Sequence, residues 1–222
     1  MRVLQSHYLN GEWQSDLLQQ PDFDLVLLFG DRELAQSSSI NEQIKLAYPN
    51  AELVGCTTSG EIIDARVYDQ SLVLTAIQLE RAKVATESVS IDNYEDSYAA
   101  GKALASKLAP DGLKCVLVLS DGQKINGTEL VAGLTSGLPE EVTISGGLAG
   151  DDARFEETLV WHNERFESGL ISICGFYGDS LQVGHGSLGG WDAFGPNRIV
   201  TKANKKEKIW VSSLHRWELT CV

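Results

Sequence analysis

Residues 25–31, LVLLFGD, indicate how this chain folds, because residues 115–121, CVLVLSD, repeat their pattern. Adding 90 to each residue number superposes the two stretches without a gap, and both are apolar runs that end at an aspartate. A short apolar run rich in β-branched residues is typical of a strand that is buried on both faces. The repetition predicts a duplicated scaffold of two similar units, each with a similar strand.

The same offset relates two glycine-rich turns. It carries Pro49 onto Pro139, and it carries residues 54–61, VGCTTSGE, onto residues 144–151, ISGGLAGD. Each turn ends in a glycine followed by an acid. The alternative is a chance likeness between two α/β units, since buried strands draw on few residue types.

Hydrophobic periodicity places helices between strands in both units. We expect strands at 24–29, 51–57, 72–79, 84–90, 114–119, 142–145, 158–162, 169–176 and 181–185, and helices at 32–48, 94–108 and 128–138. This order predicts an α/β layered fold with a mixed sheet or sheets, built from two similar half-repeats at about 24–110 and 114–203.

Composition excludes several classes of protein. The chain has 222 residues, is 43% hydrophobic and carries a formal net charge of −13, so it can bury a core but does not suit nucleic acid as a partner. No apolar stretch reaches the ~20 residues that cross a bilayer, and the N-terminus lacks the apolar core of a signal peptide. We therefore expect no membrane partner and a cytoplasmic protein. The four cysteines lie far apart, without the C-x-x-C spacing of zinc or redox sites.

The two turns carry the residues of a candidate ligand site. The first contains Gly55, Cys56, Thr57, Thr58, Ser59 and Gly60, and the second contains Gly146, Gly147, Gly150, Asp151 and Asp152. Glycine permits close approach of the backbone, so amide and hydroxyl donors can surround a polar or anionic group. A tight connection between strands needs the same residues. The repetition of the turn favours a shared site.

A histidine flanked by glycines is the third candidate element. Residues 183–191, VGHGSLGGW, contain a formal G-x-G-x-x-G, but no helix pattern follows, so a dinucleotide site is rejected. A neutral imidazole at His185, beside Gly186 and Trp191, can ligate haem iron or accept a hydrogen bond, although a lone histidine is more often structural. His162 is the second candidate, and its polar neighbours favour a hairpin turn.

Catalytic motifs find little support. Ser120 and Asp121 follow a strand, but the chain has no G-x-S-x-G elbow, and Lys124 lacks the glycine spacing of a P-loop. An enzyme would have to use Cys56 as a nucleophile activated by a nearby histidine. We therefore expect no catalytic activity and keep a cysteine-dependent enzyme as the alternative from another class.

Three segments of the chain resemble the signatures of FIST domains. They are residues 55–62 (GCTTSGEI), residues 146–151 (GGLAGD) and residues 189–196 (GGWDAFGP), and the resemblance spans about 24–202. It implies a sensory module of signal transduction that binds small ligands such as amino acids. The third segment is similar to a branch that binds haem, senses nitric oxide and regulates histidine kinases or cyclic-di-GMP enzymes.

The resemblance implies one pocket that gathers the Cys56, Gly146 and His185 loops. In the haem version, His185 is the expected axial ligand and His162 the second choice. In a haem-free version, loop amides bind the carboxylate of an amino acid, and Asp151 or Asp152 binds its amine. The resemblance also implies an N-terminal extension at 1–23, a FIST N-terminal domain at 24–203 and an atypical tail at 204–222, where a C-terminal FIST domain is expected and absent.

Overall fold

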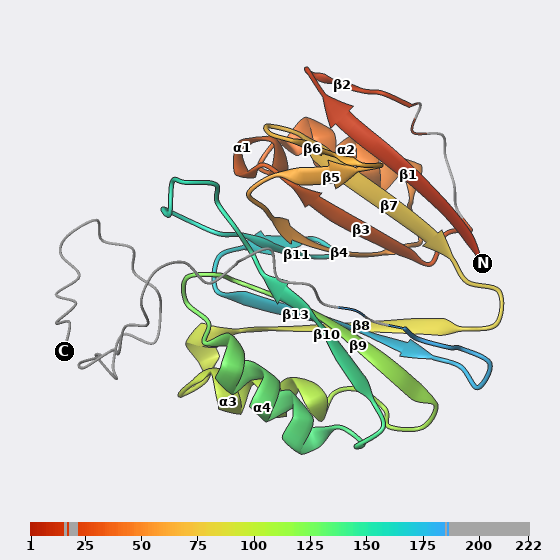
Figure 1. Cartoon of the computed structure of the whole chain (residues 1–222), viewed down its shortest axis with the longest axis vertical. Coiled ribbons are helices and arrows are strands. Elements are labelled where there is room, and N and C mark those ends of the chain that lie inside the picture. Colours follow the sequence, from red (N-terminus) through yellow and green to blue (C-terminus); the bar gives the residue numbers. More distant parts are fainter. Residues whose placement is uncertain (16, 18–21, 185, 187–222) are drawn as a thin grey trace, which may run out of the picture.

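The computed structural model describes residues 1–15, 17, 22–184 and 186, and its described strands form two main sheets (Figure 1). The first sheet has the order β12-β11-β4-β3-β7-β1-β2, and the second has the order β10-β9-β13-β8. The strands of the first sheet are β1 (Arg2–Leu9), β2 (Glu12–Trp13), β3 (Leu25–Gly30), β4 (Glu52–Thr57), β7 (Leu72–Gln78), β11 (Val160–His162) and β12 (Arg165–Glu167). Those of the second are β8 (Lys83–Ser90), β9 (Leu113–Ser120), β10 (Thr143–Leu148) and β13 (Leu170–Tyr177). A separate hairpin consists of β5 (Glu61–Ile63) and β6 (Arg66–Tyr68).

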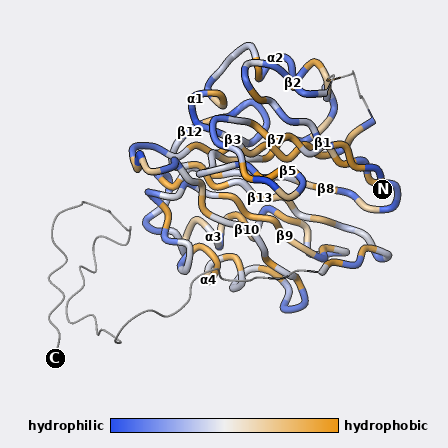
Figure 2. The backbone as a smooth tube through the Cα atoms, turned by 45° about the horizontal axis from the view of Figure 1, so that its top comes forward, coloured by the Kyte–Doolittle hydropathy of each residue, from blue (hydrophilic) through white to orange (hydrophobic). Residues whose placement is uncertain are grey.

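The sheets and helices stack in four layers. Helices α1 (Arg32–Ala35) and α2 (Ser38–Ala47) cover the outer face of the first sheet, and α3 (Ser97–Ala105) and α4 (Gly127–Gly137) cover that of the second (Figure 1). A short 3-10 helix, η1 (Ile91–Asn93), precedes α3. One apolar core lies under each helical layer, and a third lies between the sheets, where Leu25 and Val54 meet Leu119 and Leu170. Figure 2 shows the hydrophobic stretches following the strands of both sheets. The expected α/β layered fold is confirmed.

The two halves have the same topology. In the first, β3 pairs in parallel with β4 and antiparallel with β7, which pairs antiparallel with β1. In the second, β9 pairs in parallel with β10 and antiparallel with β13, which pairs antiparallel with β8. The repeated unit therefore includes the strand before each central strand. The sequence pattern did not predict β1.

The register of the repeat differs by one residue from the gapless superposition. Gly55 lies opposite Leu28, whereas Gly146 lies opposite Val118. Leu28 and Val118 are 90 positions apart, but the two glycines are 91 apart. Each needs to lack a side chain, since an added Cβ would lie 2.0 Å from the Leu28 carbonyl oxygen or 1.8 Å from that of Val118. Gly55 is therefore the counterpart of Gly146, not of Ser145.

Two expected elements also need correction. The helix expected at 32–48 is divided into α1 and α2 at Ser37, and Asp31 caps α1 by accepting the Glu33 N–H at 2.8 Å. The strand expected at 181–185 is absent over its described residues 181–184. The reason is a turn after β13, in which Gly178 has a φ of 150° and Leu181 N–H donates to its carbonyl at 3.1 Å.

The hairpin of the second half joins the sheet of the first. Strand β11 pairs antiparallel with β4, with Val160 opposite Cys56 and His162 opposite Val54. The corresponding hairpin of the first half, β5–β6, forms its own two-stranded sheet. The outer edge of β10 consequently has no partner strand in the described part of the chain, and residues 145–148 are exposed.

Candidate ligand-binding site

The structure brings the two glycine-rich turns together. Gly150 N–H donates to the Thr57 carbonyl at 2.8 Å, and a Cβ at Gly150 would lie 2.6 Å from Ser59 Oγ. The two turns follow β4 and β10, which belong to different sheets, so this contact joins the two sheets. The expected meeting of the Cys56 loop with the Gly146 loop is therefore observed at their carboxyl ends, Thr57–Gly60 and Gly150–Asp152.

The third predicted stretch, around His185, contributes Gly186 near the start of residues 145–151. Gly186 lines a groove together with Gly146 and Gly147. Its neighbours His185 and Trp191 lie outside the described residues. Residues 145–151 thus contact the Cys56 loop at one end and share a groove with Gly186 at the other.

This groove, which we call the α4–β10 groove, has a volume of about 400 Å³. Its lining is mainly apolar, and the apolar side chains are Val118, Leu130, Val131, Ile144 and Leu148. Val131 and Leu148 are 44% and 50% exposed, which is high for such residues. A Cβ added at Gly147 or Gly186 would have no heavy atom within 4 Å, so both glycines leave open space. The groove suits an apolar body that lies against exposed backbone.

A charged cluster surrounds the meeting point of the turns. Arg154 donates to Asp31 Oδ2 at 2.5 Å and to Asp152 Oδ2 at 2.8 Å. Arg32 pairs with Glu156 at 2.8 Å and with Asp151 at 3.4 Å. Hydrogen bonds to Asp152 and Asp31 raise the pKa of Arg154, so it remains charged. The sequence pattern did not predict Arg32, Arg154 or Asp31 as site residues, and only the position of Asp31 at a strand end indicated a role.

Two atoms of the cluster lack a hydrogen-bond partner among the described residues. They are Asp151 Oδ1 and Arg154 Nη1, and both are buried. Asp151 Oδ2 accepts the Glu156 and Glu157 N–H groups at 3.1 Å each, so only Oδ1 remains available. The closest charges are more distant, with Arg154 Nε 3.7 Å from Asp151 Oδ1 and Arg154 Nη1 3.5 Å from Glu33 Oε1. The cluster thus offers one acceptor and one donor to a further group.

The threonine hydroxyls of the first turn are engaged in hydrogen bonds, one to the second half of the chain and one within the turn. Thr57 Oγ1 accepts the Leu159 N–H at 3.1 Å, and Thr58 Oγ1 donates to Glu61 Oε1 at 2.7 Å. Glu61 is buried, and burial raises its pKa although hydrogen bonds from Thr58 and Ser71 act in the opposite direction. Thr57 and Thr58 therefore have a structural role, as the alternative of a tight connection suggests. Ser59 and Gly60 remain nearer the surface.

Two predicted site residues lie away from these loops. The Cys56 side chain belongs to the core between the sheets, and burial raises its pKa to about 12. The His162 side chain is next to β8, with Nδ1 3.1 Å from Ser88 Oγ, while Nε2 is buried without a partner among the described residues. Burial lowers the pKa of His162, which keeps its imidazole neutral. Neither side chain lines the α4–β10 groove.

Comparison with known families and proteins gives one finding. The model of the FIST N domain family matches residues 24–214. A search of curated proteins found no match. No helix in the described part of the chain has the length and apolar character needed to span a membrane.

Proposed function

Since this chain belongs to the FIST N domain family, whose members are small-ligand sensor domains of signal transduction, we propose that its ligand binds in the α4–β10 groove. The observation that carries this proposal is the position of Gly146, Gly147 and Gly186. These residues come from two distant motifs and line one apolar groove. Ligand binding would order the segments around the groove and shift a conformational equilibrium that a separate protein reads.

Haem is the first candidate for the ligand, and the groove supports it in two ways. The lining is apolar, and the open space beside Gly147 and Gly186 can accept a flat ring system. His185 directly precedes Gly186 in the sequence and is the proposed axial ligand. Bound haem would supply an iron that takes up nitric oxide. His162 does not fit the same role, because its side chain lies beside Ser88 of β8 and does not line this groove.

The absorption spectrum of the protein reconstituted with haem tests this assignment. We expect a sharp Soret band for the wild type and a lost or altered band for His185→Ala, whereas His162→Ala keeps the band. An unchanged spectrum for His185→Ala removes that residue from the role.

The proposed partners are a histidine kinase or a cyclic-di-GMP enzyme, which the family resemblance implies. The ligand-loaded and ligand-free forms should change the activity of the partner to different extents. The measurement is autophosphorylation of a purified kinase, or cyclic-di-GMP turnover by a purified enzyme, with each form added in turn. Equal activity with both forms contradicts a sensor role toward that partner.

A haem-free sensor of amino acids is the second candidate, and the charged cluster favours it. The buried Arg154 Nη1 can donate to a carboxylate, and Asp151 Oδ1 can accept from an amine. Asp152 adds a further carboxylate beside Arg154. A thermal-shift screen separates the candidates, because stabilisation by an amino acid and not by haem favours this one.

A cysteine-dependent enzyme receives less support. Burial raises the pKa of Cys56 to about 12, so its thiolate is scarce at neutral pH. We propose that the chain acts without catalysis. Labelling of Cys56 by iodoacetamide well below the ordinary thiol pKa would contradict this view.

A further inference from the structure

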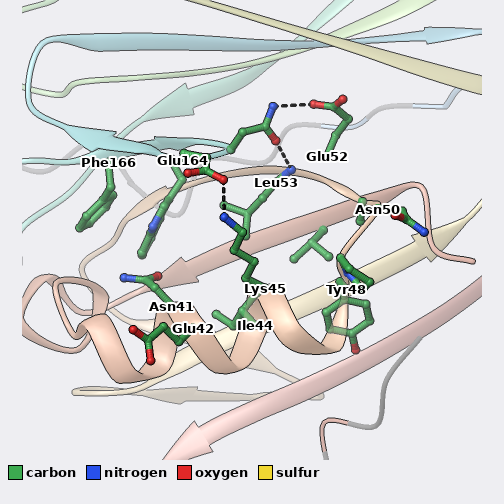
Figure 3. A pocket seen from close by; sticks show the side chains of 15 residues that line it. Asn41, Glu42, Ile44, Lys45, Tyr48, Asn50, Glu52, Leu53, Glu164 and Phe166 are labelled. Carbon is green, nitrogen blue, oxygen red and sulfur yellow. Dashed lines mark hydrogen bonds and ion pairs between the residues drawn. The ribbon is translucent and has the colours of Figure 1, made fainter. Parts of the chain in front are cut away.

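The internal repeat creates a second groove, on the first sheet. It lies between α2 and the β11–β12 hairpin and has a volume of about 490 Å³ (Figure 3). We propose that this α2–hairpin groove binds a small carboxylate with an apolar body. The groove is separate from the α4–β10 groove, and the proposal does not depend on the function assigned there.

The two halves of the chain form opposite walls of this groove. Ile44 and Lys45 come from α2 of the first half, whereas Trp161, Glu164 and Phe166 come from the hairpin of the second. The Trp161 and Phe166 rings stack, with centroids 4.0 Å apart and an interplanar angle of 19°. Pockets between structural units are frequent ligand sites. A ligand here would contact both halves at once.

The base of the groove is apolar and contains one available donor. Val26, Ile44 and Leu53 contribute to the apolar lining. Trp161 is only 2% exposed, and its indole N–H has no hydrogen-bond partner within the described residues. Trp161 lines the groove, and we infer that this nitrogen faces it, since it is not among the fully enclosed polar atoms without a partner. Buried indole N–H groups usually have an acceptor, and here a ligand can provide it.

Lys45 is the second donor. Its ammonium group pairs with Glu164 across the groove (Figure 3). The two side chains are 69% and 78% exposed, and such exposed pairs contribute little to stability. Lys45 can therefore exchange the Glu164 carboxylate for that of a ligand, while Glu164 returns to water.

The other polar groups at the mouth are mostly engaged with one another. Asn163 Oδ1 accepts the Leu53 N–H at 2.9 Å, and Asn163 Nδ2 donates to Glu52 at 2.7 Å. Glu52 also accepts from Thr86. Glu42, Glu52 and Glu164 all line the groove and oppose an anion, but Glu42 and Glu164 are exposed and screened by salt. The Trp161 N–H at the base is a donor and favours an acceptor on the ligand, whereas Asn41, which also lines the groove, already donates through its amide to the Ala35 carbonyl.

Octanoate is a suitable probe, and the Trp161 indole N–H resonance is a local reporter. In ¹⁵N–¹H NMR spectra, with the signal assigned by Trp161→Phe, we expect octanoate to shift this resonance saturably. Octan-1-ol, which has a similar apolar body without the charge, should bind more weakly. Absence of a saturable shift, or equal binding of the two compounds, overturns the proposal.

Calorimetric titration with variants of exposed residues provides a second test that does not risk the fold. Lys45→Gln should weaken octanoate binding roughly tenfold, the effect of one charge-assisted hydrogen bond. Glu164→Gln should strengthen it roughly two- to threefold, because Lys45 loses its competing partner. Lys102→Gln, an exposed lysine on α3, is the matched control. Unchanged affinity in Lys45→Gln, or weaker binding in Glu164→Gln, contradicts the assignment.

The haem spectrum of Lys45→Gln should equal that of the wild type, so failure of the carboxylate proposal is distinguishable from failure of the sensor proposal.

Discussion

Gly55 and Gly146 occupy equivalent places in the two halves, and each brings two parallel strands into close contact. At Gly146 the backbone also has a φ of 150°, a value that residues other than glycine rarely adopt. Gly147, the next residue, has open space where a Cβ would lie. Neighbouring glycines of one motif thus have different roles, since one is needed for the fold and the other leaves room in the groove.

Gly146→Ala should destabilise the protein by about 2–4 kcal/mol, because it adds a Cβ against the Val118 carbonyl oxygen at a strained φ. Gly147→Ala is the matched control and should change stability by less than about 1 kcal/mol. Urea denaturation midpoints provide the comparison. An equal loss of stability in the two variants would contradict the view that Gly146 is needed for the close approach of its backbone to Val118.

His162 should make stability depend on pH. Burial lowers its folded pKa below the ordinary value of 6.5, so the unfolded chain takes up the proton first as pH falls. The stability contribution is therefore complete above pH 6.5 and is lost between 6.5 and the lower folded pKa. The charges of Glu52 and Glu87 and the hydrogen bond at Thr86 raise this pKa, whereas Arg165 lowers it, and together they set how far the loss extends. Wild type should lose more stability than His162→Gln between about pH 7.5 and pH 5.5 in urea titrations. Parallel pH profiles for the two proteins would contradict this.

Residue identities predicted some features of the site and not others. The glycines of both turns could be recognised, because few residues permit a backbone that approaches so closely. Cys56 could not be placed from the sequence, since the alternation of a strand leaves open which face meets the second sheet. The arginines were missed because Arg154 contacts Asp31 across 123 positions, and such pairs leave no local signal.

At the scale of elements, the loop after β10 is fixed to the end of β3 by its charges. Arg154 connects Asp31, the N-cap of α1, with Asp152 in this loop. Asp31 and Asp151 are almost fully buried, and burying a carboxylate without a partner is costly. The predicted meeting of the two turns thus depends on a contact that their glycines do not reveal.

Arg154→Gln should lower stability by about 2–4 kcal/mol, because it leaves the buried carboxylate of Asp31 without a cation and leaves Asp151 with Arg32 alone. Arg165→Gln removes an exposed pair with Glu167 and should cost less than about 1 kcal/mol. Thermal or urea unfolding of the two variants gives the comparison. A similar small loss for both would show that the cluster adds little to the stability of the fold.

Periodicity predicted the main strands and helices of each half, but not the short strands β2, β5, β6 and β12 and not the pairing across halves. Residues 158–162 were expected as a strand, and β11 is one, but nothing in its sequence indicates that it pairs with β4 of the other half. Strand β1 was missed for a related reason. Its burial is mixed, with exposed residues at its start, so it lacks the apolar run that identifies β3 and β9.

At the scale of the molecule, the duplication accounts for two sheets, two helical layers and two grooves. The hairpin of the second half occupies the edge of β4 and narrows the α2–hairpin groove with Trp161 and Phe166. The matching edge of β10 has no such hairpin in the described residues, and its groove remains lined by exposed Leu148 and Val131. The two halves therefore share a topology, but their grooves have different walls.

The most direct measurement of the central claim is a haem titration of groove variants, followed by visible absorption. Leu148→Glu and Val131→Glu place a charge on exposed side chains of the α4–β10 groove, and Val67→Glu places one at a more exposed site on β6, away from this groove. We predict that both groove variants lose the Soret band of the wild type, or weaken haem binding at least about tenfold, while Val67→Glu behaves as the wild type. Haem binding that is unaffected by the groove variants, or a wild type without a Soret band, would contradict the assignment of haem to this groove.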